Sequence, residues 1–295
     1  MSATSPPGAH LLGDRIVNRM GYGAMQLAGP GVFGPPKDRG EAVAVLREAV
    51  AGGVNHIDTS DYYGPFVVND IIREALHPYP DDLVIVTKVG ARRGEGGAWL
   101  PAFTGPEVTA AVHDNLRRLG LDAMEVVNLR SMHGQMAPGE GSLDEPLEAL
   151  ARLREQGLVK HIGLSTVTRR QIEDGRRIAP IACVQNLYNL AHRDDDALID
   201  QLAAEGVPYV PYFPLGGFSP LQSQTLEATA SSLGATPMQV ALAWLLRRSP
   251  NILLIPGTSS RAHLRENLAA AALSLPQEAM ERLRDAAMAG GAPAH

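Results

Sequence analysis

Eight short apolar runs recur along the chain with helix-like stretches between them, and this alternation limits the possible folds more than any other feature. The runs have the length and composition of buried strands, and they span residues 21–25, 54–58, 83–88, 124–129, 159–164, 181–185, 207–211 and 252–255. Apolar residues at helical spacing, with Gly or Pro at the ends, occupy residues 39–51, 105–119, 143–156 and 197–204. Eight such strand-helix units predict an α/β fold, a closed (β/α)8 TIM barrel.

The length of the chain agrees with one such barrel. A barrel of this kind takes roughly 250 residues, although 295 residues would also accommodate two average domains. No low-complexity linker divides the sequence, so we predict a single domain over residues 1–295, with loose tails at 1–9 and 290–295. Two short strand-like pieces around Gly13 and Asp14 predict a β-hairpin over residues 10–19.

Charge and composition argue against several classes of protein. A net charge of −6 provides no basic field, so no nucleic-acid or anionic-membrane partner is expected. No run approaches the roughly 18 apolar residues that span a bilayer, and the first residues lack the pattern of a signal peptide, which together predict a cytoplasmic protein. Cys183 is the only cysteine and lies in an apolar run, so we expect a buried thiol. No metal site is predicted.

Four residues with acid-base chemistry follow successive apolar runs. Asp58 and Lys88 end two of the runs, Tyr63 follows Asp58 by five positions, and His133 follows the next run. In a (β/α)8 barrel such residues meet at the carboxyl-end face, where active sites lie. A phenol titrates near pH ~10 and donates a proton usefully at neutral pH only beside a cation. Lys88 would supply that cation and Asp58 would keep it charged; the alternatives are an ordinary buried tyrosine and a structural histidine.

Taken together, the Asp-x4-Tyr, Thr-Lys and strand-end His set resembles the aldo-keto reductases, from about Arg15 to Leu283. The resemblance implies a hairpin at the barrel bottom and NADP(H)-dependent reduction of an aldehyde or ketone to an alcohol. In that reaction Tyr63 would protonate the carbonyl oxygen, Lys88 would lower the pKa of Tyr63, and His133 would orient the carbonyl. The sequence has no G-x-G-x-x-G after a strand and no Tyr-x-x-x-Lys, which argues against other reductase folds.

The resemblance also implies a cofactor site at the strand ends. The residues expected around the nicotinamide are Ser165, Thr166, Gln185, Tyr212, Phe213, Leu215 and Gly217. Those expected around the phosphates and adenine are Gly257, Thr258, Ser259, Arg261, His263, Glu266 and Asn267. A Ser/Thr cluster before a helix favours anions, although a simple helix N-cap at Ser259 or Ser260 would also explain it.

Three positions of the expected cofactor site depart from the family. Gly257 and His263 stand where many relatives have basic residues, and Thr166 stands where Asn is usual. Arg261 is therefore expected to pair with the 2′-phosphate. NADP (NADPH) is the expected cofactor and NAD the alternative.

Aromatic and apolar residues on the long loops after the strands are candidates for the substrate pocket. We expect Met25, Tyr62 and Trp99 there; further candidates are Phe33, Phe66, Phe103, Phe218, Arg92 and Arg93. Residues 25–34, 86–94 and 214–222 resemble the bacterial branch that includes pyridoxal reductase, which implies reduction of pyridoxal to pyridoxine. The alternatives are a broad-specificity reductase of small aldehydes and a non-catalytic, cofactor-sensing binding subunit. A small-molecule carbonyl substrate is the expected partner, and the chain is expected to be a monomer or a weak homo-oligomer.

Overall fold

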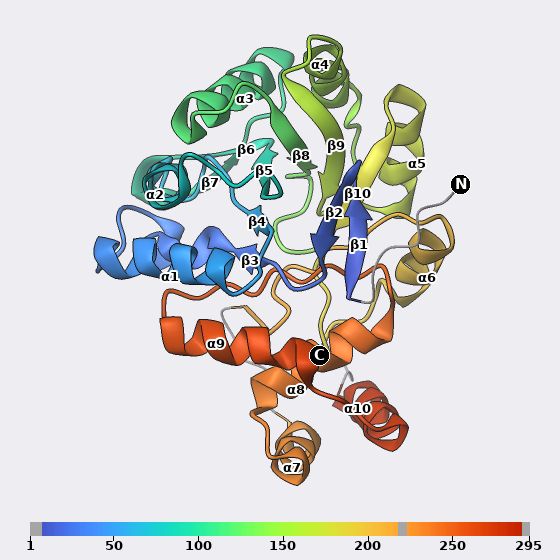
Figure 1. Cartoon of the computed structure of the whole chain (residues 1–295). Coiled ribbons are helices and arrows are strands. Elements are labelled where there is room, and N and C mark those ends of the chain that lie inside the picture. The colour runs from blue at the N-terminus through green and yellow to red at the C-terminus, as the bar shows by residue number, and fades with distance from the viewer. Residues whose placement is uncertain (1–7, 218–222, 291–295) are drawn as a thin grey trace.

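A ring of strands surrounded by helices forms the centre of the molecule (Figure 1). The computed structural model describes residues 8–217 and 223–290, except for the side chains of residues 286–290. Six parallel strands are neighbours in chain order, namely β3 (Tyr22–Gly23), β4 (His56–Asp58), β5 (Val84–Val89), β8 (Met124–Arg130), β9 (Val159–Ser165) and β10 (Ile181–Gln185). None of the helices in these ranges is long and apolar enough to cross a membrane.

Two shorter segments close the ring between β10 and β3. Tyr209 forms parallel bridges with Val184 and Ile252, and Leu254 forms one with Met20. The predicted runs at 207–211 and 252–255 therefore occupy the expected positions in the ring, but they form isolated β-bridges instead of full strands. Prolines at 208, 211, 250 and 256 explain this, because they lack the N–H that extends a strand ladder. The eight-membered ring confirms the predicted (β/α)8 barrel.

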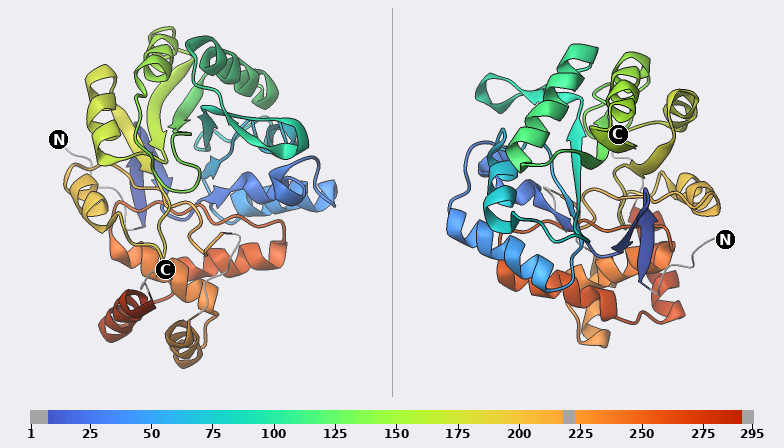
Figure 2. Two further views of the ribbon diagram at one scale, coloured as in Figure 1. Left: turned by 180° about the vertical axis from the view of Figure 1, so that it is seen from behind. Right: turned by 45° about the horizontal axis from the view of Figure 1, so that its top comes forward.

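The helices pack around the outside of the ring, as both views in Figure 2 show. They are α1 (Arg39–Ala51), α2 (Val67–Leu76), α3 (Gly105–Leu119), α4 (Asp144–Glu155), α5 (Arg169–Ile178), α6 (Asp196–Ala204), α7 (Gln224–Leu233), α8 (Pro237–Arg248), α9 (Arg261–Ala269) and α10 (Gln277–Gly290). Short 3₁₀ turns occupy Ala24–Leu27, Pro30–Val32, Glu95–Gly97 and Ala270–Ala272. Local chemistry sets the ends of α3: Thr104 and Glu107 form a capping box, and Gly120 ends the helix at φ 68°.

The predicted hairpin consists of β1 (Ala9–Leu12) and β2 (Arg15–Asn18) and closes one end of the barrel. Leu12 and Val17 are buried in one apolar cluster with residues from inside the ring: Val84, Val86, Val126, Cys183, Val210, Leu253 and Ile255. This packing agrees with the plug that the family resemblance implied. Cys183 is buried, as expected, and burial raises the pKa of its thiol to about 12.

Two expectations about irregular segments need correction. No strand was predicted within residues 90–104, yet they contain an antiparallel hairpin of β6 (Ala91–Arg93) and β7 (Trp99–Pro101). Arg93 stabilises its turn by donating to the Gly97 carbonyl at 2.7 Å. The predicted tails are also too long, because Ala9 begins β1 and Gly290 ends α10. Residues 1–7, 291–295 and Phe218 lie outside the described residues.

Candidate active site

A cavity opens at the carboxyl ends of the strands, and every member of the eight-membered ring contributes to its wall. The wall residues at or just after the strand ends are Gly23, Asp58, Lys88, Arg130, Ser165, Gln185, Tyr212 and Gly257. On β5 and β8 these residues continue the inward-facing positions of Val84 and Val86, and of Val126. Because side chains alternate along a strand, the same periodicity that fills the barrel below brings polar groups together above.

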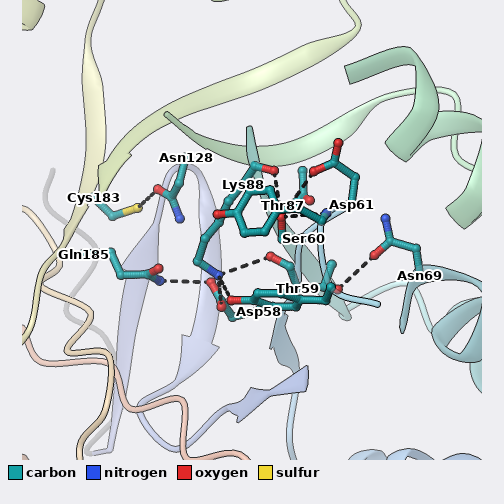
Figure 3. A network of polar contacts seen from close by, with 12 residues as sticks. Asp58, Thr59, Ser60, Asp61, Asn69, Thr87, Lys88, Asn128, Cys183 and Gln185 are labelled. Atoms are coloured by element: carbon teal, nitrogen blue, oxygen red, sulfur yellow. Dashed lines mark hydrogen bonds and ion pairs between the residues drawn. The ribbon is translucent and has the colours of Figure 1, made fainter. Parts of the chain in front are cut away.

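Lys88 connects the acid and the phenol of the predicted catalytic set, and Figure 3 shows its contact with Asp58. Its Nζ forms an ion pair with Asp58 Oδ1 and donates to Tyr63 Oη at 3.1 Å and to the Thr59 carbonyl at 3.2 Å. The other carboxylate oxygen of Asp58 accepts from Gln185 Nε2 at 2.9 Å. Asp58, Tyr63 and Lys88 are all buried. Since an ammonium in such surroundings needs a carboxylate partner, the pair keeps Lys88 charged beside the phenol.

The pKa of Tyr63 differs from the expectation. Burial and the charge of Asp58 raise the pKa of the phenol above its ordinary value, while the positive charge of Arg130 acts in the opposite direction. The contact with Lys88 is present, but the pKa of Tyr63 is not lowered in this structure. Tyr63 is therefore protonated at neutral pH, which is the state that a proton donor needs.

A buried polar network holds the segment between Asp58 and Tyr63 (Figure 3). Ser60 Oγ donates to the Lys88 carbonyl at 3.1 Å, and Thr59 Oγ1 donates to Asn69 Oδ1 at 2.9 Å. Asn69 in turn donates to Asn115 Oδ1 at 2.8 Å, which links α2 to α3. Asp61 in the same segment is buried, and burial raises the pKa of its carboxyl to about 7 against the opposing hydrogen bond from Ser60. These residues escaped the sequence analysis, although the asparagines interrupt apolar helix faces.

His133 does not join the other three residues. Strand β8 ends at Arg130, so His133 lies three residues beyond the strand end, exposed, with Nε2 3.0 Å from the Ser142 carbonyl. Its ring packs beside Phe103 at 5.2 Å between centroids, and neither residue is part of the cavity wall. Arg130 faces the cavity instead. Side chains at every second position of a strand face the same way, so Val126, Asn128 and Arg130 face the same way. This periodicity could have identified Arg130 from the sequence.

Most residues expected around the nicotinamide line the cavity. Those in its wall are Ser165, Gln185, Tyr212, Phe213, Leu215 and Gly217. Thr166 is fully buried behind the wall, with Oγ1 donating to Tyr212 Oη at 3.4 Å. Gln185 Oε1 is buried and has no hydrogen-bond partner within the described part of the chain. A buried acceptor without a partner is costly, so this oxygen fits a ligand that donates an N–H, such as a carboxamide.

The segment expected around the phosphates begins at the edge of the cavity with Gly257 and continues away from it. A Cβ added to Gly257 would lie 2.6 Å from the Gly23 carbonyl oxygen, which explains why no basic side chain occupies this position. Ser260 caps α9, as the alternative reading of the Ser/Thr cluster allowed, and Thr258 Oγ1 accepts from the Ser260 N–H at 3.1 Å. Ser259 is exposed.

The charged residues of that segment already have partners. Arg261 forms an ion pair with Glu41 of α1 at 3.2 Å, a contact that the sequence did not indicate. Glu266 accepts a hydrogen bond from Thr236, His263 is exposed, and Asn267 is buried. The guanidinium of Arg261 is half-exposed, so its outer face remains accessible to an anion.

Met25, Tyr62 and Trp99 all line the cavity, as expected for a substrate pocket. Tyr62 packs edge to face against Trp99 with 5.4 Å between ring centroids. Phe33, Phe66, Arg92 and Arg93 are not part of this wall. Arg93 instead supports the loop from behind, with Cζ 4.2 Å from the Trp99 centroid and a hydrogen bond to the Val32 carbonyl.

Comparisons with known proteins agree with this geometry. Residues 19–287 match the model of the aldo/keto reductase family. The chain is 68% identical over 273 residues to pyridoxine 4-dehydrogenase of Escherichia coli, covering 92% of this chain and 96% of that protein. It is 35% identical to an uncharacterized oxidoreductase of Schizosaccharomyces pombe, covering 95% and 90%.

Solved structures give the same fold. A thermostable aldo-keto reductase in complex with the inhibitor epalrestat superposes with a TM-score of 0.79 at 30% identity, covering 94% of this chain and 98% of that one. An aldo-keto reductase of Klebsiella pneumoniae in complex with NADPH superposes with a TM-score of 0.77 at 25% identity, covering 94% of each chain.

Proposed function

Because the chain belongs to the aldo/keto reductase family, we propose that it is an NADP-dependent reductase that converts pyridoxal to pyridoxine. The observation that most strongly supports catalysis is the contact of Lys88 Nζ with both Asp58 and Tyr63 Oη inside an open cavity. This arrangement places a protonated phenol beside a cation that can stabilise its conjugate base.

Tyr63 acts as the proton donor to the carbonyl oxygen in this proposal. NADPH, when bound, supplies the hydride that no side chain can provide. As Tyr63 loses its proton, the ammonium of Lys88 at 3.1 Å stabilises the phenolate. Asp58, held by Gln185, keeps Lys88 charged and in position. In the reverse direction the same phenolate takes the proton of the alcohol.

Residues in and near the cavity support the proposed cofactor site. Gln185 Oε1 would accept from the carboxamide, Ser165 lies next to it in the wall, and the ring of Tyr212 would face the nicotinamide. The N-terminus of α9, with Thr258 and Arg261, would hold the 2′-phosphate. The Klebsiella pneumoniae relative crystallised with NADPH supports NADP over NAD, the alternative.

Two observations support pyridoxal as the substrate. The Escherichia coli relative that is 68% identical carries the name pyridoxine 4-dehydrogenase. In addition, Tyr62 and Trp99 form an aromatic wall that suits a planar ring. The single-domain organisation of residues 1–295, a monomeric or weakly homo-oligomeric state and a cytoplasmic location stay predictions.

Consumption of NADPH in the presence of pyridoxal, and of NADH in a parallel series, tests the proposal. We expect NADPH oxidation that depends on pyridoxal and exceeds that with methylglyoxal in kcat/KM, and we expect Tyr63→Phe to abolish it. Preference for methylglyoxal would indicate a broad reductase of small aldehydes. Binding of NADPH without reduction of any aldehyde would indicate a cofactor-sensing binding subunit, and the proposed activity would be wrong.

A further inference from the structure

Arg130 is the last residue of β8, and its side chain forms part of the cavity wall. The guanidinium is anchored by nearby groups: it donates to the Gln135 carbonyl at 2.6 Å, to the Ser131 carbonyl at 3.3 Å and to the sulfur of Met132. Its Cζ lies 5.9 Å from the centroid of the Trp99 ring. These contacts hold a planar cation at one side of the aromatic wall.

Among residues 8–217 and 223–285, no carboxylate lies within ion-pair distance of Arg130, whereas Lys88 pairs with Asp58 and Arg261 with Glu41. In the part of the cavity wall that the structure describes, three residues are charged, and the two besides Arg130, namely Asp58 and Lys88, neutralise each other. The open surface of the cavity therefore has a net positive charge, located at Arg130, which favours an anionic group on the ligand.

The position of Arg130 indicates that its positive charge faces the substrate and not the cofactor phosphates. In the ring of eight, β8 is four positions from the segment at 252–255 that leads to the expected phosphate site, so the two lie on opposite sides of the barrel. Arg130 instead lies in the same cavity wall as Tyr62 and Tyr63. Burial raises the pKa of both phenols, and the charge of Arg130 acts in the opposite direction. The cation thus lies near the proton donor.

We propose that Arg130 is a specificity-determining residue that binds an oxyanion on the ring carbon next to the reacting aldehyde. The substrate class is therefore the ortho-hydroxy aromatic aldehydes in their phenolate form, a class that includes pyridoxal. A planar guanidinium has adjacent N–H groups that match two neighbouring oxygen atoms better than an ammonium does. Trp99 and Tyr62 would flank the aromatic ring while Arg130 selects the charged oxygen. This inference rests on the proposed function and extends it.

Reduction of 2-hydroxybenzaldehyde and 2-methoxybenzaldehyde by the NADPH-bound enzyme tests this inference, because only the first compound can form a phenolate. We expect wild type to favour the hydroxy compound in kcat/KM, increasingly so as the pH rises and the phenol ionises. Arg130→Met should lower this ratio by about tenfold or more, as expected for loss of a hydrogen bond to a charged group, and should remove its pH dependence. Arg130→Lys should retain part of the preference. Arg170→Met, at an exposed site on α5, is the matched control and should leave the ratio unchanged.

Titration with 2-hydroxybenzamide and 2-methoxybenzamide, which are not reduced, measures the same preference by binding alone. An Arg130→Met enzyme that still reduces both aldehydes with the wild-type ratio would overturn the role of Arg130 while leaving the reductase assignment intact. An equal loss for both aldehydes would also overturn it, because a structural role alone produces that result. If wild type reduces no aldehyde but prefers 2-hydroxybenzamide over 2-methoxybenzamide, and Arg130→Met loses this preference, the oxyanion contact of Arg130 is supported and the proposed activity is wrong.

Discussion

Replacement of Lys88 by methionine should reduce both the stability and the activity of the enzyme. Lys88→Met leaves Asp58 as a buried carboxylate, since only 4% of its side chain is exposed. Removing one partner of a buried ion pair costs about 3 to 5 kcal/mol. Gln185 still donates to Asp58, so we expect a loss near the lower value, about 3 kcal/mol. At about 2 °C for each kcal/mol in a chain of this size, the Tm should fall by roughly 6 °C or more.

Unfolding in urea and turnover with NADPH, measured for wild type and three variants, check this reasoning. Asp58→Asn should also be destabilised, because it leaves a buried ammonium without its carboxylate. The double variant Asp58→Asn with Lys88→Met removes both charges and should be more stable than the sum of the single losses predicts, by about 2 kcal/mol. The two variants that lack Lys88 should lose activity by about 100-fold or more, since the phenolate then has no cation beside it. Additive losses of stability, or an active Lys88→Met enzyme, would refute the proposed role of the pair.

Four further predictions concern single residues. Tyr63→Phe should lower kcat by at least about 100-fold while the Kd for NADPH, measured by fluorescence, hardly changes; retention of a tenth of the activity would contradict its role as proton donor. Arg261→Ala should weaken NADPH about tenfold or more and leave NADH unchanged, and equal weakening of both would mean that another group binds the 2′-phosphate. His133→Ala should change kcat/KM less than about threefold, because the ring lies outside the cavity, and a large loss would restore the original assignment. Burial raises the pKa of Asp61 to about 7, so the folded state binds this proton more tightly than the unfolded state does. The stability that this proton contributes is fully present below the unfolded pKa and is lost as the pH rises through about 7. Urea titrations should therefore show Asp61→Asn gaining stability over wild type between about pH 4 and pH 8, and a constant difference would contradict this.

The sequence predicted the parts of the fold that depend on local patterns. Helices α1 and α3 have the predicted ends, because Asp38 and Thr104 cap them and glycine follows each. The barrel, the hairpin and the family resemblance were confirmed, and the contact of Asp58, Tyr63 and Lys88 followed from their positions at strand ends.

What the sequence did not reveal depends on which way side chains face and on contacts across long separations. His133 was chosen because a histidine after this strand matched the family pattern, and Arg130 was not among the candidates, although Arg130 is in phase with the buried residues of β8. The partner of Arg261 is Glu41, 220 residues away, and no local pattern joins them. Burial also reversed the expected direction of the Tyr63 pKa, since desolvation depends on the whole environment.

The close approach of Gly257 to Gly23 determines where cofactor preference can be redesigned. A side chain at position 257 would meet the Gly23 carbonyl oxygen at 2.6 Å, so a lysine or arginine introduced there would force the two backbone segments apart. His263 offers a better position, because it is exposed in the first turn of α9. Engineering toward tighter NADPH binding should therefore begin with a basic residue at 263, and engineering toward NADH should begin with an acidic one.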